Sequence, residues 1–161
     1  MVSLKSYEEN DPDFVEDLKR SDKHVDKVVA WLKAKGIHAV KRPLRIREKI
    51  EEMSKFSDKG DIEAVVNGSL QRIEAKQRFI KFTSKEDFPY DTIIVDVAHA
   101  WEKANPKPMA YILTNRSCTV CLVVSTKTSD RWIKKKRWDS KKRRMRVFYE
   151  CPIELTKFHR M

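Results

Sequence analysis

Two acidic residues and one lysine are spaced so that a β-hairpin would bring them together. Asn67-Gly68 is the strongest short signal for a two-residue hairpin turn, and the stretches on either side of it are β-rich with alternating polar and apolar residues. Counting outward from this turn, Asp61 faces Glu74, and Lys76 lies two residues further along on the same face. The pattern therefore places two carboxylates and an ammonium group on one side of a sheet.

Facing carboxylates repel each other unless positive charge lies between them. Lys76 supplies one positive charge, and a divalent cation would supply two more. Mg²⁺ favours carboxylate oxygens and retains several waters. The spacing thus predicts a metal site with an ammonium group beside its bound water. The alternative is an ordinary solvent-facing hairpin on which Glu74 and Lys76 form surface ion pairs.

The same register divides the hairpin into two faces, because side chains alternate along a strand. The predicted polar face carries Asp61, Glu63, Arg72, Glu74, Lys76 and Arg78. The predicted core face carries Ile62, Ala64, Val66, Ile73, Ala75 and Phe79.

Positive charge is concentrated in residues 131–146, which hold ten Lys and Arg residues and one Asp, a local charge of +9 out of a formal net charge of +11. Such a field attracts polyanions, since each neutralised phosphate releases a counterion. The residues expected to contact phosphates are Arg131, Lys134, Lys135, Lys136, Arg137, Lys141, Lys142, Arg143 and Arg144. Trp132 and Trp138 interrupt this segment and either stack on bases or anchor it to the core. A solvated basic helix is the alternative interpretation.

The 161 residues suit one domain, and their patterns favour an α/β (α+β) class: a central mixed β-sheet with an N-terminal helix and further helices flanking it. The patterns leave the conformation of the basic segment open. Residues 44–56 fit a helix only loosely, and 57–60 read as a turn. The other predicted elements are a helix from Pro12 to Gly36, a short strand or connector over 37–43, and a short helix over 98–104. Strands are predicted over 61–66, 72–80, 92–97, 109–113, 119–125 and 146–151, with 92–97 buried on both faces.

The stretches 57–62 (SDKGDI) and 73–77 (IEAKQ) resemble the PD-(D/E)XK nuclease superfamily. That pattern is an acid near the start of one strand and E-x-K on the next, within a core of order α-β-β-β-α-β. Gly60 stands where the pattern usually has a proline. The resemblance implies a restriction-endonuclease-like fold and a Mg²⁺-dependent nuclease, with Mn²⁺ able to substitute. DNA is favoured over RNA, and an endonuclease over an exonuclease.

Carried over residue by residue, the resemblance implies that Asp61, Glu74 and the backbone carbonyl of Ala75 hold the metal. Lys76 would orient or activate the attacking water. Some members add an acid from the first helix, and Glu16, Glu48 and Glu52 are candidates here. The resemblance also implies a homodimer, since cutting both strands of a duplex usually needs two sites.

Two other functions fit the same sequence. One is a nucleic-acid-binding protein without catalysis. The other is a zinc-stabilised interaction module using Cys118, Cys121, Cys151 and His159. Three cysteines and the absence of a signal peptide or a long apolar run favour the cytoplasm of a bacterial or virus-infected cell, with no membrane partner. With three glycines the sequence shows no Walker loop, so nucleotide hydrolysis by that route is unsupported.

Overall fold

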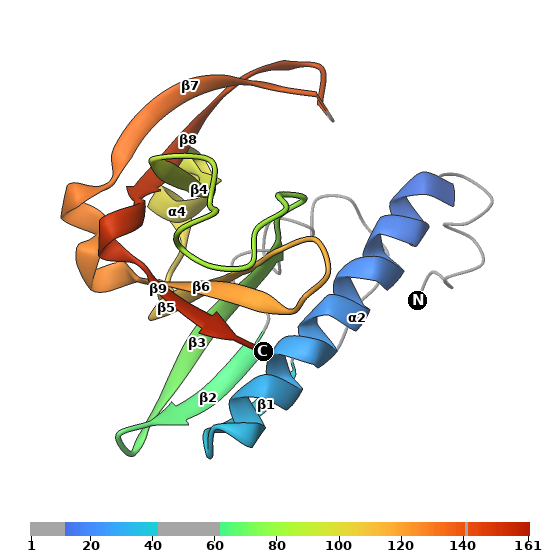
Figure 1. Ribbon diagram of the computed structural model, residues 1–161, viewed down its shortest axis with the longest axis vertical. Coiled ribbons are helices and arrows are strands. Elements are labelled where there is room, and N and C mark those ends of the chain that lie inside the picture. Colours follow the sequence, from blue (N-terminus) through green and yellow to red (C-terminus); the bar gives the residue numbers. More distant parts are fainter. Residues whose placement is uncertain (1–11, 42–61, 141) are drawn as a thin grey trace.

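The computed structural model describes residues 12–41, 62–140 and 142–161, which form a long helix, two β-sheets and short helical turns (Figure 1). The main sheet has the strand order β1-β2-β3-β5-β6-β9, and the second sheet has the order β4-β8-β7. The strands are β1 (His38–Lys41), β2 (Ile62–Val66), β3 (Ser69–Gln77), β4 (Thr92–Val97), β5 (Ala110–Thr114), β6 (Val120–Ser125), β7 (Ile133–Asp139), β8 (Arg144–Pro152) and β9 (Lys157–Arg160). The helices are α2 (Pro12–Ala34) and α4 (Ala98–Lys103), with 3₁₀ turns η2 (Thr126–Arg131) and η3 (Ile153–Leu155).

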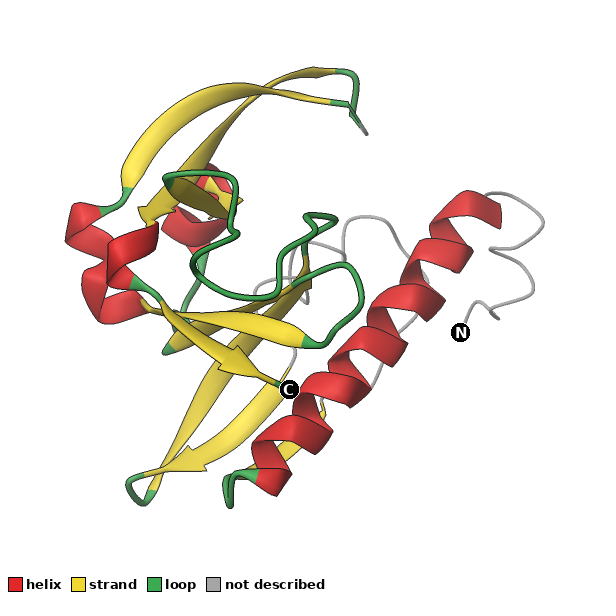
Figure 2. Ribbon diagram, in the orientation of Figure 1, coloured by secondary structure: helices red, strands yellow, loops and turns green. Residues whose placement is uncertain are grey.

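Helix α2 covers one face of the main sheet (Figure 2). Its buried side chains Val25, Val28, Val29 and Leu32 recur at helical spacing and form one stripe against the strands. The helix ends where predicted, because Gly36 adopts a positive φ of 81°. There the Gly36 N–H donates to the Lys33 carbonyl and the Ile37 N–H to the Leu32 carbonyl, a Schellman cap.

The β2–β3 hairpin has the predicted register. Ile62 faces Ile73, and Val66 faces Ser69 across the turn. Both turn residues have positive φ, 50° at Asn67 and 78° at Gly68, as a two-residue turn matching the strand twist requires. The predicted assignment of faces is confirmed for Ile62, Ala64, Ile73 and Ala75, which are buried beneath α2, whereas Phe79 lies beyond the strand and is exposed.

Strand β3 occupies the middle of the main sheet, antiparallel to β2 and parallel to β5. The parallel pairing requires a crossover, and the chain makes it through β4 and α4. The sheet separates two hydrophobic clusters, one under α2 and one on the opposite face, where Tyr111 and Leu113 pack with Ile93 and Val95 of β4. Alternate residues of β3 therefore face different environments.

The structure differs from the sequence-based predictions in several places. Residues 92–97 form β4 as predicted, but Ile93 and Val95 are buried while the positions between them are only half-buried, so the strand is not covered on both faces. The basic helix that was the alternative for residues 131–146 does not form, because the larger part of this segment forms the β7–β8 hairpin. Among the described residues after β4, the helical elements are α4, η2 and η3. Strand β9 was not anticipated.

The remaining strands lie within about two residues of their predicted bounds, apart from β3, which begins and ends about three residues earlier than predicted. Residues 44–56 and the turn at 57–60 fall outside the described residues, so their predictions are untested. None of the helices in the described ranges combines the length and apolar character that crossing a membrane requires.

Candidate active site and nucleic-acid interface

Glu74 and Lys76 project from β3 on the face opposite α2, because Ile73 and Ala75 between and beside them are buried under that helix. Both side chains are half-buried. Asp61, the acid predicted to face Glu74, lies outside the described residues, and the last described pair of the ladder at that end is Ile62 with Ile73. The pairing of Asp61 with Glu74 therefore stays a prediction.

Lys76 is joined to a carboxylate that the sequence did not single out. Its Nζ lies 3.0 Å from Oδ1 of Asp96, on β4. The same Oδ1 accepts a hydrogen bond of 2.8 Å from the Val97 N–H, and Oδ2 accepts one of 2.8 Å from the Tyr111 hydroxyl. The Asp96 side chain is 11% exposed and that of Lys76 31%. Asp96 thus fixes the ammonium group of Lys76 at the junction of the two sheets.

A β-bulge accompanies Asp96. Ile94 faces Glu150 and Asp96 faces Tyr149, so Val95 is an extra residue in the β4–β8 ladder. The Arg78 guanidinium donates to the carbonyls of Ile94 and Val95 at 2.8–3.1 Å, which satisfies backbone oxygens at the irregularity. Burial lowers the pKa of Arg78 to about 10, an effect that the charge of Asp96 opposes.

Burial and the negative charges at this site raise the pKa of the Tyr111 hydroxyl. Burial raises its pKa most, followed by the negative charge of Asp96 and the hydrogen bond to it, and the charge of Glu74 adds to the effect. Tyr111 faces Glu74 directly across the β3–β5 ladder. The phenol stays protonated, so it remains a hydrogen-bond donor to Asp96. Glu74, Lys76, Asp96 and Tyr111 therefore form one electrostatic unit, which we call the β3–β4 cluster.

The β3–β4 cluster supplies two carboxylates among the described residues, which suits an oxygen-preferring cation only if further ligands join them. No group of three or more His, Cys, Asp and Glu side chains close enough to hold a metal occurs in the described part of the chain. Glu48 and Glu52 lie outside it, and the structure describes the backbone but not the side chain of Glu16. A complete ligand set therefore needs a side chain that the structure does not describe, such as Asp61, Glu16, Glu48 or Glu52.

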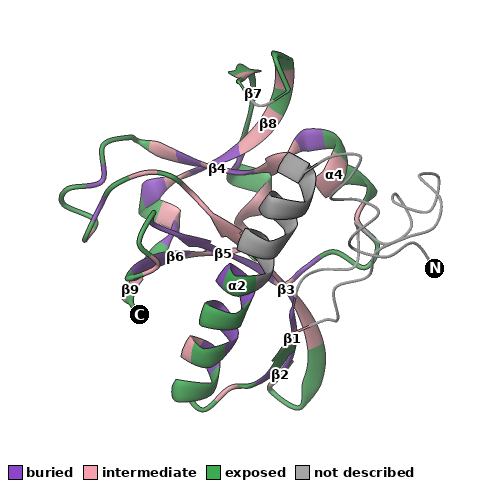
Figure 3. Cartoon of the chain, turned by 90° about the vertical axis from the view of Figure 1, so that its right-hand side faces the viewer, coloured by how far each residue is buried: buried purple, intermediate pink, exposed green. Residues whose placement is uncertain are grey.

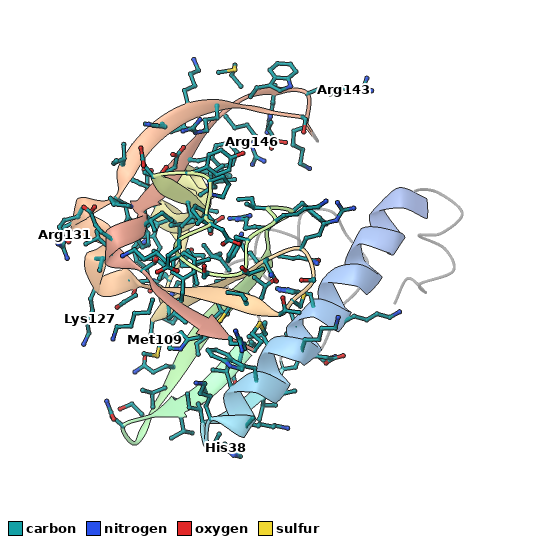
Figure 4. The ribbon with its side chains drawn as sticks, in the orientation of Figure 1. His38, Met109, Lys127, Arg131, Arg143 and Arg146 are labelled. Atoms are coloured by element: carbon teal, nitrogen blue, oxygen red, sulfur yellow. The ribbon has the colours of Figure 1, made fainter. Side chains whose placement is uncertain are left out.

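The second predicted element, the basic segment, forms a hairpin that projects from one end of the molecule and is mostly exposed (Figures 1 and 3). Arg131 lies at its root and Arg143 at its tip, so the cations are spread along its whole length (Figure 4). Lys141 falls outside the described residues.

Some of the cations predicted to contact phosphates form ion pairs within the protein. Arg137 forms an ion pair with Glu150, which is 1% exposed. Burial alone would raise the pKa of Glu150, but hydrogen bonds from Arg137 and Thr92 outweigh it and lower that pKa. Lys134 pairs with Glu102 of α4 at 2.8 Å. The guanidinium of Arg137 thus compensates a buried charge, and its assignment to a phosphate stays a prediction.

The remaining cations of the hairpin extend toward solvent. They form no ion pair with a described residue. These cations are Lys135, Lys136, Lys142, Arg143 and Arg144. Arg146, which was not assigned to phosphate, pairs with Asp139 at 2.9 Å.

The two tryptophans have different environments. Trp132 is 8% exposed, its Nε1 donates to Thr128 Oγ1 at 3.0 Å, and its ring packs on Trp101 with centroids 4.9 Å apart. Trp132 is therefore an anchor, one of the two roles left open. Trp138 is 62% exposed, so its indole face is accessible to a base.

The four residues of the zinc alternative are not assembled. Cys121 belongs to the cluster under α2 and Cys151 to the cluster on the other face of the sheet. Burial raises the pKa of the Cys121 thiol to about 12, which disfavours the thiolate that zinc needs. His159 packs its ring against Trp31.

Comparison with protein-family models, with curated proteins and with solved structures finds no match for this chain.

Proposed function

We propose that this protein is a Mg²⁺-dependent nuclease that hydrolyses phosphodiester bonds, acting on DNA rather than RNA and as an endonuclease. The observation that carries the proposal is the β3–β4 cluster: Glu74 and Lys76 share one face of β3, and Asp96 holds the lysine in place. A hydrolase for phosphodiesters needs such a combination of oxygen ligands and a positioned cationic donor.

The order of elements supports the same proposal. The described elements from α2 to β5 run helix, three strands, helix, strand, if β4 is regarded as an addition before α4. This is the order that the resemblance to the PD-(D/E)XK superfamily implies. A restriction-endonuclease-like fold, a cytoplasmic location and a homodimer belong to the proposal.

In this mechanism Asp61, Glu74 and the carbonyl of Ala75 would hold Mg²⁺. When bound, the metal supplies an acidified water and neutralises charge on the phosphate. The ammonium group of Lys76 orients the attacking water and donates to a phosphate oxygen as negative charge develops. Asp96 acts as a positioning residue, because its bonds to the Val97 N–H and the Tyr111 hydroxyl leave it little freedom to turn away from Lys76.

Binding without catalysis is the second candidate function. It is favoured by the ion pair between Lys76 and Asp96, which occupies the ammonium group, and by the absence of a three-ligand metal group among the described residues. The two candidates differ in one measurable property, which is turnover in Mg²⁺.

The decisive experiment compares cleavage of plasmid and single-stranded DNA and of RNA in Mg²⁺, Mn²⁺ and EDTA. We expect cleavage only with a metal, and we expect Asp61→Ala, Glu74→Ala and Lys76→Ala each to abolish it. Binding of DNA in EDTA should stay within about twofold for Lys76→Ala, since the hairpin supplies most of the positive charge.

Lys127→Ala is a matched control, because Lys127 is an exposed lysine of η2 at a distance from the hairpin tip (Figure 4). It should cleave like the wild-type protein. Unchanged cleavage by Lys76→Ala would refute the nuclease proposal, and DNA binding with no cleavage under any condition would favour the second candidate.

A further inference from the structure

The β7–β8 hairpin has one face that combines positive charge with exposed apolar side chains. Cross-strand neighbours share a face, and the register pairs Lys136 with Val147 and Trp138 with Met145. Trp138 is 62% exposed, Met145 49% and Val147 36%. We call this the Trp138 face. The Trp138 indole and the Met145 side chain are therefore exposed to solvent on this face, and no described element covers them.

The opposite face of the hairpin is compensated in part. Arg137 is paired with Glu150 there, and Arg146 is paired with Asp139. Lys135 and Arg144 also lie on that face and are exposed, but its aromatic ring, that of Phe148, is half-buried. The exposed aromatic ring of the hairpin therefore lies on the Trp138 face, beside Lys136.

A pocket of about 350 Å³ separates the hairpin from the start of α4. Its walls come from the hairpin and from the segment that follows Asp96, and they include Val97, His99, Glu102, Arg144, Met145 and Val147. Since Val97 directly follows Asp96 and donates its N–H to that carboxylate, the pocket begins one residue from the β3–β4 cluster. The pocket thus extends from the hairpin to the residue that follows Asp96.

We propose that the Trp138 face binds single-stranded nucleic acid, with one unpaired base stacked on the Trp138 indole and a flanking phosphate bound by Lys136. Stacking requires an open base face, which a single strand presents and a Watson–Crick duplex hides within its own stack. The local charge of +9 over residues 131–146 suits a polyanion. That the strand continues along the pocket to Lys76 rests on the proposed function.

The test measures binding of a fluorescein-labelled 12-nucleotide single strand of dT, and of a duplex of mixed sequence, by anisotropy in EDTA, so that cleavage plays no part. Trp138→Ala should weaken single-strand binding about tenfold, which is the usual loss for one stacked base. Trp138→Phe, which keeps an aromatic face, should recover most of it. Lys136→Ala should lower the salt dependence of single-strand binding by about 0.7 in log–log slope.

Leu70→Ala is the control, because Leu70 is 67% exposed and lies at the β2–β3 turn, at the far end of the molecule from the hairpin (Figure 1). It should bind like the wild-type protein. All these residues are exposed, so the variants should fold, and circular dichroism checks this.

The proposal would be overturned if Trp138→Ala left single-strand binding unchanged. It would also be overturned if the variant lost equal affinity for single strand and duplex, or if the wild-type protein bound neither. If the Trp138 effect is present but Mg²⁺-dependent cleavage is not, the binding surface stands and the nuclease proposal falls. If the protein cleaves DNA in Mg²⁺ but Trp138→Ala leaves single-strand binding unchanged, the nuclease proposal stands and the proposal for the Trp138 face falls.

Discussion

The hydrogen-bonded pair Asp96 and Tyr111 permits a quantitative test of the β3–β4 cluster. Asp96→Ala removes the acceptor of three donors, the Lys76 ammonium, the Val97 N–H and the Tyr111 hydroxyl. Lys76 is 31% exposed and recovers part of its loss from water, but Tyr111 is 1% exposed and its hydroxyl is left buried without a partner. An orphaned buried hydroxyl alone costs about 1–3 kcal/mol.

We therefore expect Asp96→Ala to lower the free energy of unfolding by about 3 kcal/mol. A domain of typical stability, about 5–15 kcal/mol, would still be folded. Tyr111→Phe removes one hydrogen bond to a carboxylate and should cost about 1–2 kcal/mol. In the Asp96→Ala background, Tyr111→Phe should cost nothing or be slightly stabilising, because the orphaned hydroxyl disappears.

The assay is urea-induced unfolding at pH 7, followed by circular dichroism, for the wild-type protein, both single variants and the double variant. The double-mutant cycle should give a coupling free energy of about 1–2 kcal/mol. Additive effects would show that Tyr111 and Asp96 do not interact, and the account of how Lys76 is positioned would then be wrong.

Two further predictions concern buried charge. His24 is 4% exposed, bonds to Thr114 Oγ1 at 2.8 Å, and burial followed by the charge of Lys27 lowers its pKa to about 4 from 6.5. Because the imidazole is protonated at a higher pH in the unfolded chain than in the folded one, the free energy of unfolding should be full above pH 6.5 and fall by about 2.5 kcal/mol between pH 7.5 and 4.5. Urea unfolding should show a smaller fall for His24→Gln. Equal falls in the two proteins would contradict the lowered pKa of His24. Arg137→Ala should lower the free energy of unfolding by about 2–3 kcal/mol, since it leaves Glu150 buried with Thr92 alone, whereas Lys136→Ala should change it by less than about 0.5 kcal/mol. Equal stability of these two variants in urea would refute the structural role of Arg137.

Local signals were enough to predict the hairpin and the strand that carries the candidate site. Asn67-Gly68 determines both the turn and the register, and through the register the face on which Glu74 and Lys76 lie. The spacing of Val25, Val28 and Leu32 likewise predicts α2 and the face it buries. These features depend on residues that are close in sequence, so periodicity and turn chemistry suffice to infer them.

The features that were missed depend on contacts between distant segments. Asp96 lies in a run of β-branched residues that reads as an ordinary buried strand, and its pairing with Lys76, twenty residues away, arises only when β4 joins the second sheet. The bulge at Val95 has no local sequence signal. The conformation of the basic segment was left open because charge density says nothing about backbone conformation, although its alternation of Lys136, Arg137 and Trp138 is compatible with the strand that forms.

β7 is an edge strand, since the second sheet ends there and its outer backbone groups pair with no described strand. An exposed edge is a template for pairing with another molecule, and lysine-rich edges oppose this because two copies brought together would place like charges side by side. The four consecutive cations Lys134, Lys135, Lys136 and Arg137 make such an approach unfavourable. The hairpin therefore protects the protein from sheet-to-sheet aggregation, and nucleic acid that neutralised those charges would remove part of that protection.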